Sequence, residues 1–383
     1  MRGSIRKRVG KRGVYYDVVF DIGRDPVTGK RKQKWLRGFR TKKEAEAALA
    51  QAIAEVERGT YIDPEKVTLA EYLKEWHAAR KHKLSLRTWE RYGQLIEHWL
   101  IPHLGGIPLR KLSPVHLEKF ISAMLEADRL DGKGKISPTT VRHAALVLNK
   151  ALRDAVKKRL IPYNPMEAVD KPRKARKEPP ALKEGELRRL MSAAEGTYLY
   201  APITLAVYTG ARLGEILGLR WRDVDFEAGC IFILQALKRN LKGELYFDEP
   251  KTPRSRRRIE IGPACLAALR KQKKLQAEWK LKAGSAWQET GLVCTREDGS
   301  PIDPHAFSSA FRKLASKLGI DANFHALRHT HATMLLKAGV HLKIVSERLG
   351  HASVAITGDL YSHVLPGMQG GAAQLVEEEL NGR

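Results

Sequence analysis

The chain has 383 residues, 43% of them hydrophobic, which is enough for two or three domains that each bury a core. Lys and Arg number 69 against 43 Asp and Glu, and this formal charge of +26 indicates a polyanionic partner, with nucleic acid favoured over a membrane surface. Because no signal peptide, apolar run of about 18 residues or paired-cysteine pattern is present, we expect neither a secreted, a membrane-spanning nor a disulfide-rich protein.

Residues 1–63 are predicted to form a small separate unit. Two strand-like runs, VYYDVVFDI and RKQKWLRGF, flank a turn, and the basic segment GSIRKRV before them can add a third strand. A capping box at Thr41 and Glu44 followed by an apolar stripe predicts one helix behind this sheet. Residues 1–60 contain 16 Lys and Arg against 7 Asp and Glu, which favours a sheet face laid against DNA, although any one lysine is more often simply solvated.

Residues 64–170 have a wholly helical pattern. A capping box at 68–71, a second helix ending at Pro102, and Ser-Pro helix starts at 113–114 and 137–138 predict four helices in a compact bundle. Their aromatic and leucine stripes are interpreted as core rather than as a cofactor site.

Residues 171–181, with the sequence KPRKARKEPPA, are predicted to be a linker because they have three prolines and no apolar periodicity. The remaining segment, 182–383, begins with helices, passes through strands at 231–234 and 257–261, and ends with helices.

The segment YTGARLGEILGLRW, residues 208–221, is predicted to join two helices. Gly210 ends the first and Ala211 begins the second, so Arg212 is expected in a first helical turn, where free backbone N–H groups and the helix dipole favour an anion. Glu215 shares the outward side of this helix with Arg212. Taken alone, such a pair is more often a surface ion pair than a site.

Residues 324–364 contain three short helical patterns. His325 and Arg328 are three residues apart and share one face near the start of the first helix. The second helix stops at a glycine, which places His351 in the following turn, and a serine can cap the third helix, whose later turns hold Tyr361. The four side chains can therefore converge on one pocket.

Six residues occur in one order over the last segment and form a specific set: Arg212 in TGxRxxE, Lys251 in a loop between strands, His325 and Arg328 in HxLRH, His351 in LGH, and Tyr361 after it. This set resembles the tyrosine recombinase family, the phage-integrase type of site-specific DNA recombinases. The resemblance implies a mainly α fold with small β-sheets and three domains. These are an arm-type DNA-binding domain with a three-stranded sheet plus helix (1–63), a four-helix core-site DNA-binding bundle (64–170), and, after the linker, a mixed α/β catalytic domain with a C-terminal tail (182–383).

The resemblance assigns the reacting groups. Tyr361 is the implied nucleophile, which forms a covalent 3′-phosphotyrosyl link. Arg212 and Arg328 would surround the phosphorane with fixed positive charge, and His351 would donate a hydrogen bond to a non-bridging oxygen.

The proton transfers are assigned in the same way. His325 is the implied base or proton shuttle for the phenol, and Lys251 is the implied general acid for the departing 5′ oxygen. Glu215 would orient Arg212 or His325. Other basic residues within 238–258 could approach the same phosphate in place of Lys251.

The implied substrate is double-stranded DNA with core-type and arm-type sites, cut by a homo-tetramer that exchanges strands through a Holliday junction and is assisted by DNA-bending and excision factors. The tail after Tyr361 would pack on a neighbouring protomer, with packing on its own protomer as the alternative. No ATP, metal, organic cofactor or membrane is implied, and the expected location is the bacterial cytoplasm, on the nucleoid.

Two other functions are weighed against integration and excision of a mobile element. A type IB topoisomerase-like enzyme uses similar chemistry, but the separate basic unit at 1–63 favours two kinds of DNA site. A non-catalytic DNA-binding or architectural protein on the same fold predicts the loss of a catalytic position, whereas all six are present.

Three residues near this set receive a structural interpretation. His329 and His331 form an HxH pattern, but we expect His331 in the core and His329 at the surface rather than a metal site. Gly358 should cost its helix ~1 kcal/mol relative to alanine. It is a tolerated substitution without a role, a close packing contact or, as we hypothesise, a device that loosens the tyrosine segment until the protein assembles on DNA.

Overall fold

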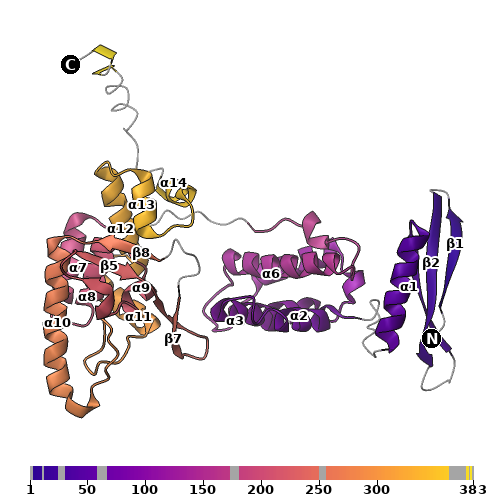
Figure 1. Cartoon of the computed structure of the whole chain (residues 1–383), viewed down its shortest axis with the longest axis horizontal. Helices are drawn as coiled ribbons and strands as arrows, with labels where there is room; N and C mark the ends of the chain where they lie inside the picture. Colours follow the sequence, from indigo (N-terminus) through magenta and orange to yellow (C-terminus); the bar gives the residue numbers. More distant parts are fainter. Residues whose placement is uncertain are drawn as a thin grey trace. The chain divides into compact units, whose positions relative to one another are not determined.

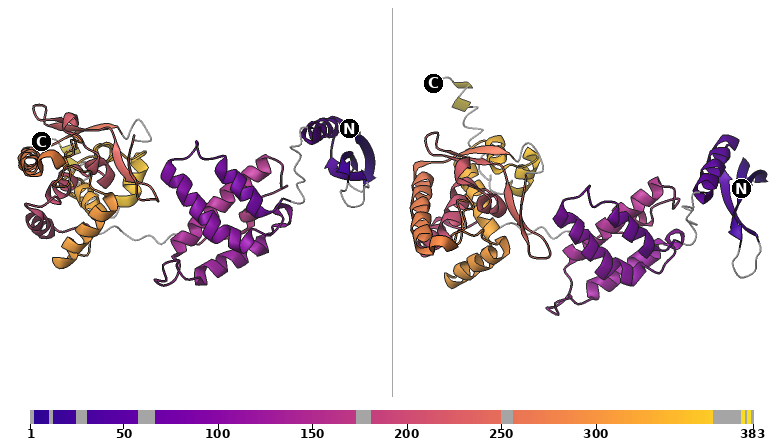
Figure 2. Two further views of the ribbon diagram at one scale, coloured as in Figure 1. Left: turned by 90° about the horizontal axis from the view of Figure 1, so that it is seen from below. Right: turned by 60° about the horizontal axis from the view of Figure 1, so that its bottom comes forward.

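The computed structural model divides the chain into two compact units, Met1–Lys174 and Ala175–Arg383. Figures 1 and 2 show the ribbon from three directions. The structure describes residues 3–10, 13–24, 31–57, 67–172, 181–249, 256–361, 377–378 and 380–381. The predicted linker lies largely outside the described residues, and so does the tail directly after Tyr361.

The first unit begins with an antiparallel three-stranded sheet of order β1-β2-β3. Helix α1 covers one face of this sheet (Figures 1 and 2) and buries Ala45 and Ala52 against Val18 and Phe20. The elements are β1 (Gly3–Gly10), β2 (Gly13–Arg24), β3 (Arg31–Phe39) and α1 (Lys42–Glu57). The predicted sheet with one backing helix is thus confirmed.

A helical bundle with its own apolar core completes the first unit. Its main helices are α2 (Leu69–Ala78), α3 (Leu86–Leu95), α4 (Ile101–Leu104), α5 (Pro114–Glu126) and α6 (Pro138–Lys157). The predicted helix end at Pro102 is wrong, because α3 continues into α4 through a π-helical turn, Ile96–Leu100. In this wider turn the N–H of Ile101 donates to the carbonyl of Ile96, and the proline follows at the second position of α4, where its missing N–H costs little.

The second unit places helices around two small antiparallel sheets, β4-β5-β8 and β6-β7. The helices are α7 (Glu184–Ala194), α8 (Tyr200–Thr209), α9 (Leu213–Leu217), α10 (Pro263–Ala283), α11 (Pro304–Lys317), α12 (Phe324–Lys337), α13 (Leu342–Leu349) and α14 (Val354–Tyr361). The strands are β4 (Val224–Asp225), β5 (Cys230–Ile233), β6 (Ala236–Arg239), β7 (Leu245–Asp248) and β8 (Arg257–Glu260). The predicted strands coincide with β5 and β8, whereas the hairpin β6-β7 was not predicted.

Helix α12 is central to this unit. It packs against α8, α11 and α13, and its apolar residues Phe324, Ala326 and Leu327 belong to the main core. Helices α13 and α14 then follow in the order predicted for residues 324–364. Within the described part of the chain, none of the helices combines the length and the apolar character needed to cross a bilayer.

Candidate active site

Arg212 lies at the junction of α8 and α9. It is the N-cap residue of α9, so the predicted position inside the first turn is one residue too far along. The backbone N–H of Arg212 donates to Glu215 Oε2 at 2.9 Å and Nη1 donates to Oε1 at 2.8 Å. The sequence predicted a backbone N–H free to bind an anion, but this N–H is already bonded to Glu215. The Arg212 side chain is 42% exposed, so its guanidinium is the group that can bind an anion.

Glu215 also binds a second arginine, Arg257 on β8. Arg257 Nη2 donates to Glu215 Oε2 at 2.8 Å, and its Nε donates to the carbonyl of Arg348 at 2.7 Å. Burial pushes the pKa of Glu215 upward, but Arg257 and Arg212 outweigh burial and lower the pKa to about 2. The carboxylate is thus charged and holds both guanidinium groups. Sequence reasoning named Arg257 only among the basic residues that could approach the phosphate and missed its bond to Glu215, although the alternation of β8 places it on the same face as buried Ile259.

Arg328, on α12, is 3% exposed and is anchored by backbone oxygens. Its Nη1 donates to the carbonyl of Gly210 at 2.7 Å and its Nη2 to that of Leu349 at 2.8 Å. Arg212 Nη2 reaches the adjacent carbonyl of Gly350 at 3.2 Å, so both guanidinium groups meet at the end of α13. Burial, reinforced by Arg212, lowers the pKa of Arg328 to about 9, which leaves it cationic at neutral pH.

We call Arg212, Glu215, Arg257 and Arg328 the arginine–glutamate cluster. Three guanidinium groups face one carboxylate, so the cluster carries an excess of positive charge. Its hydrogen bonds fix these charges before any substrate binds. Such an arrangement favours a bound anion with planar or tetrahedral oxygen geometry, such as a phosphate.

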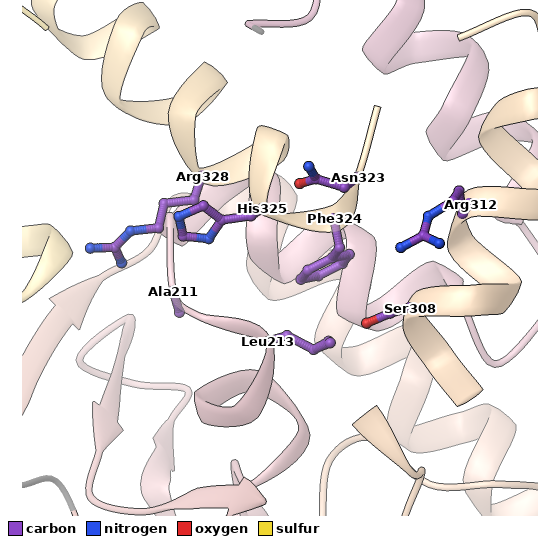
Figure 3. A pocket seen from close by; sticks show the side chains of 8 residues that line it. All are labelled: Ala211, Leu213, Ser308, Arg312, Asn323, Phe324, His325 and Arg328. Atoms are coloured by element: carbon purple, nitrogen blue, oxygen red, sulfur yellow. The ribbon is translucent and has the colours of Figure 1, made fainter. Parts of the chain in front are cut away.

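A pocket of about 190 Å³ lies beside the cluster, between α9, α11 and α12. In Figure 3, His325 and Arg328 reach it from one side and Arg312 from the opposite side, with Phe324 between them. His325 and Arg328 therefore share a face of α12, as their spacing predicts.

His351 occupies the predicted turn between α13 and α14. Gly350 ends α13 in the left-handed conformation, with φ 66°, and His351 Nδ1 lies 2.7 Å from Thr357 Oγ1. Burial is the largest cause that lowers the pKa of His351 to about 4, followed by Arg328 and Arg212. The imidazole is thus neutral at neutral pH and stands next to both arginines.

Tyr361 ends α14 and is only 2% exposed. Its ring packs in a small apolar cluster with Leu336, Val345 and Leu349. Its hydroxyl lies 2.7 Å from Nδ1 of His329. Burial raises the pKa of Tyr361 to about 12, so the phenol keeps its proton at neutral pH.

The predicted surface position of His329 is wrong, since this residue is 8% exposed and contacts Tyr361. The sequence held a usable signal: His329 follows His325 by four residues and therefore lies on the same face of α12. His331 is buried as predicted, with Nδ1 2.8 Å from the carbonyl of Val207.

The structure thus brings together six of the seven residues singled out from the sequence: Arg212, Glu215, His325, Arg328, His351 and Tyr361. Lys251 lies in 250–255, outside the described residues, and its place in the site stays a prediction.

Three parts of the chain match known protein families. Residues 180–367 match the phage integrase family, residues 4–56 match an arm DNA-binding domain, and residues 68–125 match the N-terminal SAM-like domain of phage integrases.

A known protein is similar to this chain along almost its whole length. Over 393 aligned residues the chain is 30% identical to a tyrosine recombinase XerC-like protein of Caldanaerobacter subterraneus subsp. tengcongensis, and the alignment covers 95% of this chain and 96% of that protein.

Solved structures share the fold. The Tn1549 transposon integrase in complex with transposon right end DNA has a TM-score of 0.68 at 21% identity, covering 82% of this chain and 99% of that one. The lambda integrase in a tetramer bound to a Holliday junction has a TM-score of 0.58 at 20% identity, and the match covers 92% of this chain and 94% of that one.

Proposed function

The chain belongs to the phage integrase family of tyrosine recombinases, and we propose that it integrates and excises a mobile genetic element by site-specific DNA strand transfer. The observation that carries this proposal is the convergence of two backbone-anchored arginines with Tyr361. Arg328 and Arg212 are held on the adjacent carbonyls of Leu349 and Gly350, and His329, the residue after Arg328 on α12, lies 2.7 Å from the Tyr361 hydroxyl.

In the proposed reaction, Tyr361 attacks a DNA phosphate and forms a 3′-phosphotyrosyl link, which keeps the energy of the broken bond for rejoining. Arg212 and Arg328 hold the non-bridging oxygens and stabilise the negative charge of the phosphorane. His351 adds a hydrogen bond from the turn after α13.

The remaining groups support this step. Glu215 fixes Arg212 through two hydrogen bonds. His325 reaches the pocket beside Arg328 and is proposed as base or proton shuttle. Lys251 is proposed as the general acid that protonates the departing 5′ oxygen.

Two kinds of DNA site are proposed for the first unit. The sheet of residues 1–63 is proposed to bind arm-type sites: on the face opposite α1, Arg6 and Arg37 stack on Trp35 with 4.8 and 5.5 Å from guanidinium carbon to ring centroid. The match of residues 4–56 to an arm DNA-binding domain supports this assignment. The bundle of residues 64–170 is proposed to bind core-type sites.

The proposed assembly is a homo-tetramer that exchanges strands through a Holliday junction. The shared fold with the lambda integrase, whose structure is a tetramer on such a junction, supports it. A tail exchanged between protomers, DNA-bending and excision factors, and action on the nucleoid in the cytoplasm complete the proposal.

A nicked suicide DNA substrate tests the function. We expect an SDS-resistant protein–DNA adduct with the intact protein and none with Tyr361→Phe. The absence of an adduct with the intact protein on its own attachment site, under conditions where it binds that DNA, would contradict the proposal.

A further inference from the structure

The phenol of Tyr361 is hydrogen-bonded to a histidine outside the set expected from the sequence. His329 Nδ1 lies 2.7 Å from the Tyr361 hydroxyl, and both side chains are buried. His329 directly follows Arg328 on α12, so the helix that presents a cation to the phosphate also presents this imidazole to the nucleophile. Its position is therefore fixed relative to Arg328, and the hydrogen bond places it at the tyrosine hydroxyl.

His329 is uncharged at neutral pH, so one of its ring nitrogens can accept a proton. Burial lowers its pKa to about 4, and His325 and Arg328 add to the shift, so the ring is neutral at neutral pH. The charged and titratable groups around it are His325 and Arg328 on α12, Tyr361 on α14 and His351 in the turn before α14. A phenolate formed here is stabilised by the Arg328 cation, which acts to lower the pKa of Tyr361.

We propose that His329 holds the Tyr361 hydroxyl and takes its proton as the tyrosine attacks the phosphate, an inference that rests on the strand-transfer function proposed above. The bond from Tyr361 Oη to phosphorus forms, the bond from phosphorus to the 5′ oxygen breaks, and the phenol proton moves to Nδ1 of His329. The 5′ oxygen takes its proton from the separate general acid. On rejoining, the imidazolium returns the proton to the tyrosine.

His325 lies next to His329 and can take part in the proton transfer. Its ring stands edge-on to that of His329, with the centroids 4.6 Å apart, and it lines the pocket. It is therefore positioned to pass a proton between His329 and the pocket, or to contact the phosphate itself.

The test is the rate of adduct formation on a suicide substrate with a sulfur atom in place of the departing 5′ oxygen. A thiolate leaves without a general acid, so only proton removal from the phenol stays pH-dependent. The intact protein should react at a nearly constant rate between about pH 6 and about pH 8, because His329 is neutral and Arg328 is cationic throughout this range.

His329→Asn separates holding from proton acceptance. Its amide can still hydrogen-bond the phenol but cannot take the proton. We expect the rate at neutral pH to fall about 100-fold or more, and to rise towards tenfold per pH unit as the phenolate fraction grows. His331→Asn is the matched control, a buried histidine on the same helix, and should leave the flat pH profile unchanged.

Three results would overturn the proposal. His329→Asn with the parental rate and a flat profile would mean that His329 only holds the phenol. An equal loss at every pH would indicate a structural role. A rate of the intact protein that already rises tenfold per unit from about pH 6 would show that solvent ionises the phenol, and this result needs no variant. If the intact protein formed no adduct at all, the proposed function would fail instead.

Discussion

The two halves of the active site differ in how firmly they are held. In the arginine–glutamate cluster, Glu215 accepts hydrogen bonds from both Arg212 and Arg257, and Arg328 is anchored on the carbonyls of Gly210 and Leu349. The tyrosine segment, α14, is an eight-residue helix whose last residue is held by the bond to His329 and a small apolar cluster.

This difference indicates how the reaction is controlled. The groups proposed to hold the phosphate are preorganised by redundant contacts, which is what stabilisation of a developing charge requires. Tyr361, the proposed nucleophile, is 2% exposed and would first have to be uncovered to reach DNA. Helix α14 is held by the Tyr361–His329 bond and by the contact of Thr357 with His351, and breaking these two contacts should cost less than breaking the arginine–glutamate cluster.

Glu215→Gln should destabilise the arginine–glutamate cluster. The change leaves two guanidinium groups beside a neutral side chain, and removing one partner of a buried pair costs about 3–5 kcal/mol. We expect a lower calorimetric midpoint for the second unit and little adduct. Glu184→Gln, in an exposed ion pair with Arg188, should cost no more than about 0.5 kcal/mol.

The pH dependence of stability follows from the same residue. The pKa of Glu215 is about 2 in the folded protein and near 4.5 ordinarily. Because the folded value is lower, the stabilisation is complete above the ordinary pKa and is lost as the pH falls towards 2. The parent protein should therefore lose more stability on acidification than Glu215→Gln, and equal losses would contradict the assignment.

Gly350→Ala tests the packing beneath the cluster. An added Cβ would lie 2.8 Å from Arg257 Nη1, and Arg257 cannot move aside because Glu215 and the carbonyl of Arg348 hold it. We expect a loss of about 1–3 kcal/mol from the left-handed backbone and a further loss from this clash.

Gly339→Ala is the matched control, since its φ is 78° and no atom lies within 4 Å of an added Cβ. Chemical denaturation should show the smaller loss for this variant. Equal losses for the two glycines would mean that Arg257 is not held as firmly as its contacts indicate.

Tyr361→Phe should show how weakly the other half is held. Removing the hydroxyl loses one buried hydrogen bond, and we expect a cost of about 0.5–1.5 kcal/mol together with complete loss of the adduct. Tyr163→Phe, at a side chain that is 59% exposed, should change neither. A much larger loss with Tyr361→Phe would place this residue among the firmly held groups.

Gly358→Ala has the smallest expected effect on stability. The nearest atom to an added Cβ is Leu342 Cδ2 at 3.8 Å, an ordinary contact, so the close-packing interpretation of this glycine loses its basis. Alanine should stabilise α14 by up to about 1 kcal/mol and slow cleavage, because the tyrosine segment is then harder to move. Cleavage at the parental rate would sink the loosening hypothesis.

Local spacing predicted much of this molecule. The shared helix face of His325 and Arg328, the place of His351 after the glycine that ends α13, and the N-terminal sheet with one helix were all predicted. Each of these features depends on residues that are close in sequence. Glu215 was placed beside Arg212 for the same reason.

Contacts between distant elements were harder to predict. Arg257 meets Glu215 across 42 residues, and Tyr361 meets His329 across 32, so only the packing of β8 and α14 reveals them. The helix through Pro102 needed a π-helical turn, a local geometry that helical periodicity does not encode. Local spacing therefore placed Glu215 beside Arg212, but it did not predict the contact of Arg257 with Glu215 or that of His329 with Tyr361.

The excess of positive charge in the arginine–glutamate cluster has a thermodynamic consequence. Three guanidinium groups share the single carboxylate of Glu215, so the cluster should attract the DNA phosphate of the proposed reaction. By linkage, DNA that binds this site should stabilise the second unit, as any ligand specific for the native state does. A phosphate bound beside Arg328 should also raise the lowered pKa of that guanidinium from about 9. DNA binding in alkaline solution should therefore take up protons as well as stabilise the folded second unit.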